Sequence, residues 1–300
     1  MNKKALAIDV GGTKIYNTIV NNNGEIIGEI EKRPTPKTFE GIKEVLKDII
    51  SRYEDDVDVI AFATAGAVNN ENTRVIGSTG NIAKEYPTLD FQALSKKPVF
   101  VENDANAAAW AEHIIGASKG MPYSIMLTLG TGVGGGIILN NVLYKGKNGA
   151  AGEMHFKMRS DKHRKCTCGS YDCFEAYASG TGLKKTAEEI SGDSDITTYD
   201  VIENKSRPMM AKILEVWQED ILNGIIGLAN LFDPDVIVLS GSMAEFVDTD
   251  YLEREANSQI VTTPFKVVKA SAGNYSGMIG AALLAMGVGL ENTVSANGKS

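Results

Sequence analysis

The chain has 300 residues, 43% of them hydrophobic and 23% charged, and its formal net charge is −8. This composition is that of a globular protein, and the length favours two domains over one. The acidic balance excludes proteins held on nucleic acid by general attraction, which need a basic face, so we expect no nucleic-acid partner. No apolar stretch approaches the roughly 20 residues of a membrane span, so we expect no membrane partner either.

The cysteines and the first residues indicate the cellular compartment. Three cysteines lie together at positions 166, 168 and 173, and the segment before Asp9 has too few apolar residues for a secretion signal. An odd, clustered set of cysteines without such a signal indicates reduced thiols or a metal site, not a disulfide framework. We therefore expect a cytoplasmic protein.

Strand and turn patterns alternate in the first part of the chain. The sequence Asn21-Asn22-Asn23-Gly24 is typical of a hairpin turn, because Asn and Gly tolerate a positive φ. Apolar residues at helical spacing follow after residue 40. The expected elements are strands at 5–9, 15–20 and 25–31, a helix at 40–53, strands at 57–63 and 99–102, and a helix at 105–115.

A similar order of patterns returns in the second part. The expected elements are a strand at 124–129, a glycine-rich turn at 130–136, a strand at 136–139, helices at 174–190 and 207–232, strands at 236–239 and 265–270, and a helix at 278–286. Because strand, glycine-rich turn, strand and Asn-rich turn occur twice, we expect two similar α/β domains. The first covers residues 1–116, with 276–300 as a candidate addition, and the second covers 117–275 and includes a cysteine-rich motif at 153–175.

The first candidate phosphate site follows the first strand, where the sequence is D-V-G-G-T-K. Glycines let backbone N–H groups approach a phosphate closely, and a threonine hydroxyl adds a donor. The carboxylate of Asp9 is a candidate ligand of Mg²⁺, directly or through water. The alternative is an ordinary β-turn. The candidate residues are Asp9, Gly11, Gly12, Thr13 and Lys14.

The second candidate phosphate site is the glycine-rich segment 130–136, with five glycines in seven residues after an apolar strand. Each glycine loses more chain entropy on ordering than alanine does, so packing alone explains the run poorly. A loop that approaches phosphate closely explains it better, and the alternative is a flexible hairpin. The candidate residues are Gly130, Thr131, Gly132 and Gly134.

A polar group, Glu102-Asn103-Asp104, ends one expected strand and begins a helix. One interpretation is that Asn103 or Asp104 only caps the helix, which is a common use of these residue types. Between two phosphate loops, Asp104 becomes the candidate general base, with Asn103 as a neighbour that binds a hydroxyl group.

Six motifs occur in an order that resembles the repressor, open-reading-frame and kinase (ROK) family of sugar kinases. They are DVGGTK, VENDANAAAWAE, LGTGVGGG, AGEMHF, CTCGSYDCFEAYASG and VIVLSGS, and the resemblance covers about residues 4–287. It implies the actin-like, ribonuclease-H-like fold, in which two similar α/β domains flank a deep cleft. The repeated strand and turn pattern agrees with that fold.

The resemblance also implies roles for individual residues. Asp104 matches the aspartate that takes the proton from the C6 hydroxyl of the sugar, and Asn103 matches an asparagine that binds a neighbouring hydroxyl. Further sugar-binding residues are implied at Asn81, Glu153, His155 and Glu175. Gly241 matches a glycine beside the adenosine. Phosphoryl transfer needs positioning, charge neutralisation and a base more than covalent help from the protein, which agrees with this set.

The sequence departs from the family pattern after Glu153. The family has Glu-x-Gly-His ten residues before its cysteine motif, and its histidine is a zinc ligand; here Phe156 occupies that position and His155 precedes it. Three thiolates remain where a tetrahedral structural zinc needs four ligands. We expect zinc on Cys166, Cys168 and Cys173, with His155 or His163 as the fourth ligand. The alternatives are Asp172 or water as that ligand, or three reduced cysteines without a metal.

The expected function is ATP-dependent phosphorylation of a hexose at its C6 hydroxyl, with Mg-ATP held by the two glycine-rich loops. Glucose is the leading candidate, followed by N-acetylmannosamine, fructose, allose or a β-glucoside. A sugar-binding or regulatory protein with weak catalysis is the alternative, because Phe156 cannot hydrogen-bond a hydroxyl. The family's transcription regulators carry an N-terminal DNA-binding domain, for which we expect no room before Asp9. The resemblance further implies a homodimer.

Overall fold

A computed structural model describes residues 2–77, 82–158 and 161–290. The described residues form two compact units. The first unit consists of those within 1–122, 136–152 and 271–300, and the second consists of those within 123–135 and 153–270. The expected domain boundaries near residues 116 and 275 stay a prediction. None of the helices within the described residues is long and apolar enough to cross a membrane.

The first unit contains a five-stranded sheet with the order β3-β2-β1-β4-β5. Its strands are β1 (Lys4–Val10), β2 (Lys14–Asn21), β3 (Glu31–Pro34), β4 (Val59–Thr64) and β5 (Val99–Asn103). β2 is antiparallel to β1 and β3, whereas β1, β4 and β5 are parallel. In this register Asp9 pairs with Ala63, and Ala63 pairs with Glu102. The carboxyl ends of β1 and β5 therefore meet at one edge of the sheet.

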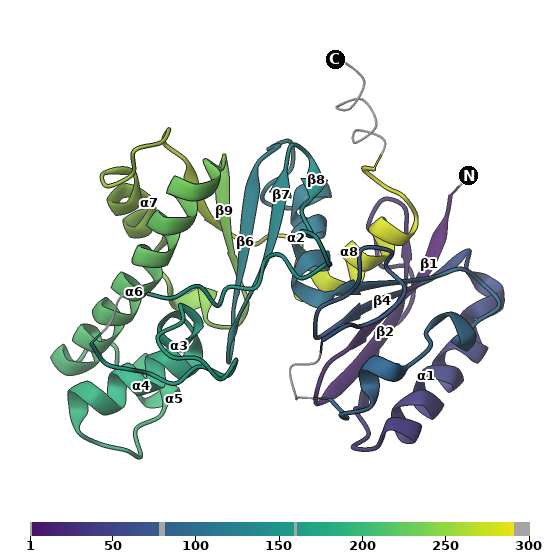
Figure 1. Cartoon of the computed structure of the whole chain (residues 1–300), viewed down its shortest axis with the longest axis horizontal. Coiled ribbons are helices and arrows are strands. Elements are labelled where there is room, and N and C mark those ends of the chain that lie inside the picture. The colour runs from purple at the N-terminus through teal and green to yellow at the C-terminus, as the bar shows by residue number, and fades with distance from the viewer. Residues whose placement is uncertain (1, 78–81, 159–160, 291–300) are drawn as a thin grey trace. The chain divides into compact units, whose positions relative to one another are not determined.

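Helices cover both faces of this sheet. They are α1 (Phe39–Tyr53), α2 (Asp104–Ile114) and α8 (Ser276–Ala285), shown around β1, β2 and β4 in Figure 1. Leu6, Ile8 and Val10 of β1 pack with the buried face of α1. On the other side, Ala5 and Ala7 share a core with residues of α2 and α8. The alternation of side chains along a strand, with period two, explains why β1 supplies both cores.

A second five-stranded sheet has the order β10-β9-β6-β7-β8. Its strands are β6 (Ser124–Leu129), β7 (Val133–Leu139), β8 (Val142–Leu143), β9 (Val236–Ser240) and β10 (Lys266–Lys269). β6, β9 and β10 are parallel, and β8 is antiparallel to β7. In chain order, both sheets place the third, second, first, fourth and fifth strand side by side. This common order agrees with the repeated pattern in the sequence.

The second unit contains the remaining α-helices of the described residues. They are α3 (Glu175–Ala178), α4 (Gly180–Ser191), α5 (Thr198–Glu203), α6 (Pro208–Phe232) and α7 (Thr249–Asn257). Short 3-10 helices lie at Glu54–Asp56, Tyr86–Thr88, Gln92–Leu94 and Ala244–Phe246. Trp217 of α6 is fully buried, and its indole N–H donates to the carbonyls of Ala178 and Ser179. This contact fixes α6 against the beginning of α4.

Three expected elements differ in the structure. The expected helix at 174–190 is interrupted at Ser179, whose extended backbone ends α3 and caps α4. The expected strand at 25–31 is wrong, because Ile26 forms only a single bridge with Val20 and β3 begins later. The cause is the side chain of Asn21, whose Oδ1 accepts the N–H groups of Asn23 and Glu25 at 2.9 and 3.0 Å. The glycine-rich turn is also shorter than expected, since β7 begins at Val133 and includes the last three glycines.

Candidate active site

The carboxyl edge of the first sheet carries the first candidate phosphate loop. Asp9 lies near the end of β1 and is partly buried, and the turn after it closes with a bond from the Gly11 N–H to the Lys14 carbonyl at 3.0 Å. The hydroxyl of Thr35 donates to the Gly11 carbonyl at 2.6 Å, which holds the turn from outside. The side chains of Thr13 and Lys14 are exposed. The D-V-G-G-T-K motif therefore forms an ordered, accessible turn beside the Asp9 carboxylate.

Asn103 and Asp104 lie at the same edge, where β5 passes into α2. Asn103 is the N-cap of α2, and its Oδ1 accepts the N–H groups of Ala105 and Asn106, both at 3.0 Å. Its Nδ2 donates to the Gly66 carbonyl at 3.1 Å, so one of its two amide hydrogens is used there. Asp104 is the first helical residue and is exposed, and its Oδ1 accepts the N–H of Ala105 at 2.9 Å. Asn103 can therefore cap α2 through Oδ1 and still donate from Nδ2 to a hydroxyl group.

The two carboxylates of this edge act on one another. Burial, and to a smaller extent the negative charge of Asp104, raise the pKa of Asp9 from its ordinary value of 3.8 to about 7. A pair of carboxylates that resists full ionisation is a favourable place for a cation. Mg²⁺ prefers carboxylate and phosphate oxygens, so the residues present fit the ion that was expected at Asp9.

The second candidate phosphate loop lies in the second unit, where it joins β6 to β7. The carbonyl of Gly130 accepts the N–H of Gly180 at 2.8 Å, and the carbonyl of Thr131 accepts the hydroxyl of Thr181, also at 2.8 Å. The loop is thus fastened to the N-terminus of α4, whose N–H groups favour anions. Sequence reasoning missed Gly180 and Thr181, although Ser179-Gly180-Thr181-Gly182 is a visible glycine-rich helix start.

The glycines of segment 130–136 do not all serve the loop. The N–H of Gly134 donates to Thr128 Oγ1 at 3.1 Å. A Cβ at Gly136 would lie 2.5 Å from the Cβ of Ala109 and 3.0 Å from the Ala105 carbonyl oxygen. Packing against α2 therefore requires the last glycine, and the expectation that packing explains these glycines poorly is wrong at this position. Gly241 follows β9 with a φ of 86°.

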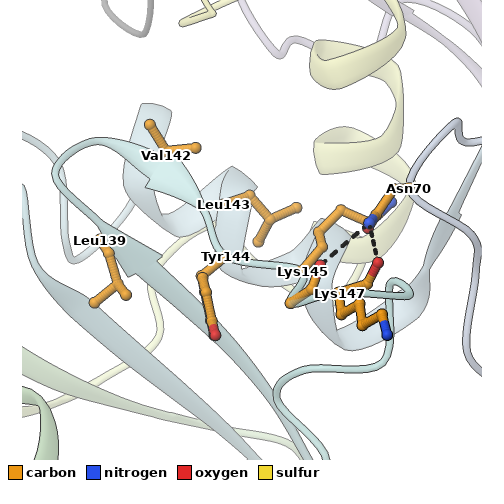
Figure 2. A pocket seen from close by; sticks show the side chains of 8 residues that line it. Asn70, Leu139, Val142, Leu143, Tyr144, Lys145 and Lys147 are labelled. Carbon is orange, nitrogen blue, oxygen red and sulfur yellow. Dashed lines mark hydrogen bonds between the residues drawn. The ribbon is translucent and has the colours of Figure 1, made fainter. Parts of the chain in front are cut away.

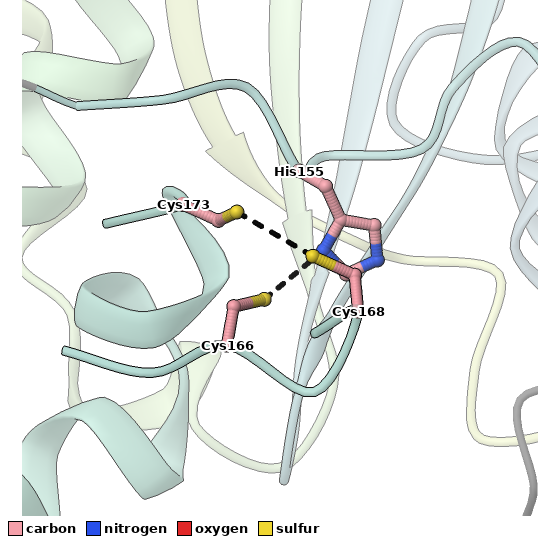
Figure 3. A group of neighbouring side chains, drawn as sticks. All are labelled: His155, Cys166, Cys168 and Cys173. Atoms are coloured by element: carbon pink, nitrogen blue, oxygen red, sulfur yellow. Dashed lines mark hydrogen bonds between the residues drawn. The ribbon is translucent and has the colours of Figure 1, made fainter. Parts of the chain in front are cut away.

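Four side chains come together in the cysteine-rich motif of the second unit: His155, Cys166, Cys168 and Cys173 (Figure 3). Their candidate ligand atoms all lie within 4.8 Å of one another. Cys168 Sγ and Cys173 Sγ are 3.6 Å apart, and Cys166 Sγ is 3.4 Å from His155 Nδ1. Tetrahedral zinc with bonds of about 2.0–2.3 Å needs separations of roughly 3.5–3.8 Å, so the cluster fits the ion.

The structure distinguishes between the two histidines. His155 belongs to the cluster, whereas the side chain of His163 is 80% exposed and lies 3.5 Å from the Asp172 carboxylate. Phe156 turns the other way and stacks on Phe174, with ring centroids 5.0 Å apart. A backbone hydrogen bond between the two segments holds this arrangement, since the Phe174 N–H donates to the Phe156 carbonyl at 2.9 Å. The histidine displaced by one position thus still reaches the thiols.

The thiols differ in their titration. Burial raises the pKa of Cys166 to about 12 and also raises that of Cys173, whereas a bond from the Ser170 N–H lowers the pKa of Cys168. A bound zinc would supply the positive charge that deprotonates coordinating thiols.

The expected sugar-binding glutamates lie next to this cluster. Glu153 Oε2 is 3.5 Å from His155 Nε2, whereas Cys166 Sγ lies near the other ring nitrogen, Nδ1. A carboxylate behind a metal-binding histidine is a common arrangement that fixes the ring. Glu175 is buried, and its Oε1 accepts the hydroxyl of Thr167 and lies 3.5 Å from Cys166 Sγ.

Glu175 also contacts the second phosphate loop. Its Oε2 accepts the N–H of Val133 at 3.1 Å, and a Cβ at Gly132 would lie 2.5 Å from the same oxygen. The loop, the glutamate and the cysteine cluster therefore form one connected group within the second unit. The remaining expected sugar-binding residue, Asn81, lies outside the described residues.

Known proteins resemble this chain over most of its length. A glucokinase of Streptomyces coelicolor is 33% identical over 311 residues, which cover 93% of this chain and 96% of that protein. An N-acetylmannosamine kinase of Yersinia pseudotuberculosis is 31% identical, with 94% and 98% covered. The structure of a ROK family glucokinase from Streptomyces griseus in complex with glucose and AMPPNP has 30% identity and a TM-score of 0.78, with 95% and 99% covered.

These likenesses confirm the expected fold class. The two sheets with a common strand order and the structural match place the chain in the actin-like, ribonuclease-H-like ATPase fold. A family model for the ROK family matches residues 5–288, nearly the whole described chain. The chain therefore belongs to the ROK family.

Proposed function

We propose that the protein is a sugar kinase that transfers the γ-phosphoryl group of ATP to the C6 hydroxyl of a hexose, with glucose as the leading candidate. The observation that carries the proposal is that Asp9 and the exposed Asp104 lie at the same carboxyl edge of the first sheet, where the charge of Asp104 acts on Asp9. Ligand sites in open α/β sheets lie at this edge. The similarity to sugar kinases supports the same activity.

In this mechanism Asp104 is the general base. The cap at Asn103 holds the start of α2, and the Asp104 carboxylate accepts the N–H of Ala105 there. A base within hydrogen-bond reach of the acceptor hydroxyl contributes about 10²–10⁴-fold to the rate. Asn103 keeps one amide hydrogen for a neighbouring hydroxyl of the sugar, since the other is donated to Gly66.

The phosphate chain of ATP would be held by backbone N–H groups rather than by basic side chains. The candidate residues are Gly11, Gly12, Thr13 and Lys14 in one loop and Gly130, Thr131, Gly132 and Gly134 in the other, with Gly241 near the nucleoside. AMPPNP is an ATP analogue, and its presence in a related glucokinase supports ATP as donor. Mg²⁺ held by Asp9 would neutralise charge on the transferring phosphoryl group.

Glucose is favoured by the glucokinase relatives, and N-acetylmannosamine is the second candidate because a kinase for that sugar is nearly as similar. Glu153, Glu175, His155 and Asn81 are the proposed sugar-binding residues besides Asn103. A carboxylate accepts hydrogen bonds from sugar hydroxyls and leaves no buried polar group unpaired. Phe156, stacked on Phe174, adds an aromatic surface where the family has an imidazole.

Zinc on His155, Cys166, Cys168 and Cys173 is the second part of the proposal, and the separations of their ligand atoms support it. The ion would hold the segment that carries Glu153 and Glu175. Metal analysis of protein purified without chelator should give about one zinc per chain. Cys173→Ser should lose the metal and His163→Ala should keep it; a wild-type ratio near zero contradicts zinc binding.

The kinase activity is tested by coupling ADP release to a spectroscopic signal, with Mg-ATP and a panel of hexoses that includes glucose and N-acetylmannosamine. Asp104→Asn should lower kcat by about 10²–10⁴-fold with little change in sugar affinity. Asp55→Asn, at an exposed carboxyl, is the matched control. If the wild-type protein turned over every sugar no faster than Asp104→Ala does, the result would contradict the proposed kinase activity. It would favour a sugar-binding or regulatory protein.

The homodimer, the cytoplasmic location and the absence of nucleic-acid partners remain predictions. Sedimentation of the purified chain at several concentrations measures the first of these directly.

A further inference from the structure

A buried ion pair lies directly behind the proposed catalytic residues in the first unit. Glu102, the residue before Asn103, is 1% exposed, and its Oε2 is 2.8 Å from Nζ of Lys145. The Lys145 side chain is itself 12% exposed. A buried carboxylate is stable only when it is paired and hydrogen-bonded, so this pair is a specific arrangement, unlike an exposed surface contact. The proposed mechanism assigns neither residue a part.

The Glu102 carboxylate holds the chain on both sides of Asp104. Its Oε1 accepts the backbone N–H of Asn103 at 2.8 Å and the Nδ2 of Asn106 at 3.3 Å. Its Oε2 accepts Nδ2 of Asn72 at 2.7 Å in addition to the lysine. The carboxylate thus joins the residue before Asp104 to the first turn of the helix after it.

The side chain of Lys145 has a second partner besides Glu102. Nζ of Lys145 also donates to the Asn69 carbonyl at 3.0 Å. Beside it, the side chain of Asn70 donates to the carbonyls of Gly146 and Lys147 at 3.1 and 2.8 Å, as Figure 2 shows. Segment 145–147 is therefore fastened to the loop that also supplies Asn72. Lys145 has a fixed place from which to hold the Glu102 carboxylate.

That loop returns to the catalytic residues by a second route. The Nδ2 of Asn72 donates to the Val101 carbonyl at 2.7 Å, and the Val101 N–H donates to the Asn72 carbonyl at 2.9 Å. A little earlier in the loop, the Gly66 carbonyl accepts Nδ2 of Asn103. A change at Lys145 therefore reaches the beginning of α2 through both Glu102 and the loop.

We propose that Lys145 is a positioning residue for Asn103 and Asp104 and acts through the buried carboxylate of Glu102. The inference rests on the proposed kinase function for its kinetic readout. Without the lysine, the buried Glu102 carboxylate loses its counter-ion, so its bonds to Asn103 and Asn106 are no longer held in one geometry and the helix start moves with it. A misplacement of about 1 Å at a reacting group can cost about 10²-fold in rate.

The experiment compares Lys145→Met with Lys147→Met, an exposed lysine two residues further along. Lys145→Met should lower kcat about 10- to 100-fold and leave KM for ATP within about twofold. Lys147→Met should leave both unchanged. The double variant Glu102→Gln/Lys145→Met removes both charges and keeps an acceptor for the Asn103 N–H. It should recover at least about fivefold of the lost kcat relative to Lys145→Met.

A second readout does not need activity. Amide exchange over residues 101–108, measured by mass spectrometry on the full chain, should be about tenfold faster in Lys145→Met than in wild type. Folded Lys145→Met with wild-type kcat and exchange overturns the inference, as does an equal loss in Lys147→Met. If wild type transfers phosphate to no sugar, the proposed function fails, and the exchange result alone then supports or overturns the role of Lys145.

Discussion

The raised pKa of Asp9 predicts how the stability of the protein depends on pH when no cation is bound. The substitution is Asp9→Asn, which replaces a carboxyl group by a neutral amide of nearly the same shape. In the folded chain the pKa of Asp9 is about 7, against an ordinary value of 3.8, because of burial and the charge of Asp104. The folded protein therefore binds the proton more tightly than the unfolded chain does.

The sign and the size follow from this difference. The stabilising contribution of the protonated carboxyl is fully present below about pH 4, and it is lost as the pH rises through about 7. The difference between the two pKa values of Asp9 corresponds to about 4 kcal/mol in the free energy of unfolding. At roughly 2 °C per kcal/mol for a chain of this size, Asp9→Asn should melt about 8 °C above wild type at about pH 8. Near pH 4 the two should melt at similar temperatures.

The assay is thermal unfolding in a chelating buffer across this pH range, with Asp55→Asn as the exposed control. Added Mg²⁺ should raise the melting temperature of wild type at about pH 8 and leave that of Asp9→Asn unchanged, because a ligand that binds only the folded state stabilises it. If the difference in melting temperature between wild type and Asp9→Asn were the same at every pH, the reasoning would be refuted. Such a result would show that the pKa of Asp9 is the same in the folded and unfolded states.

Two further predictions concern other parts of the chain. Glu112 is fully buried and accepts the N–H groups of residues 271–272, so Glu112→Gln should lower the free energy of unfolding by about 2–4 kcal/mol in urea titrations; an unchanged midpoint would contradict this. Gly132→Ala should displace Glu175 and lower kcat/KM for the sugar at least about tenfold without unfolding the chain, because the new Cβ would lie 2.5 Å from Glu175 Oε2. Gly227→Ala is its control, because a Cβ there would meet no atom within 4 Å beyond its chain neighbours and the nearby backbone of its own helix, and equal kinetics of the two variants would count against the contact.

Much of the first sheet could be predicted because its strands are short apolar runs between clear turn residues. β1, β4 and β5 lie where the sequence places them, with ends shifted by one or two residues. The segment after Asn21 could not be predicted in the same way. Its alternation suits a strand, but the bonds of one Asn side chain to two backbone N–H groups draw the chain out of the ladder.

The glycine-rich segment shows a second limit of sequence reasoning. A glycine needed for a phosphate and a glycine needed for a neighbouring helix have the same letter, and only the contact of Gly136 with Ala109 distinguishes them. Helices α5 and α7 were not expected, because each is short and its apolar face is only two or three residues wide.

The cysteine cluster shows what spacing can and cannot establish. The cysteines predict a site by themselves, but the sequence left His155 and His163 open as the fourth member. The choice depends on the pairing of residues 156–158 with 172–174, which points the ring of His155 toward Cys166. This pairing joins segments more than a dozen residues apart, and no local pattern encodes it.

The packing of α8 on β1 has a consequence for biosynthesis. Ala5 and Ala7 leave the ribosome long before their partners in the core, Met278, Ala281 and Ala282. One apolar face of the first sheet therefore has no cover while most of the chain is being made. The second unit, whose residues end at Ala270, can close before the first. A nascent chain stalled before residue 276 would expose that face, which is the kind of surface that chaperones bind.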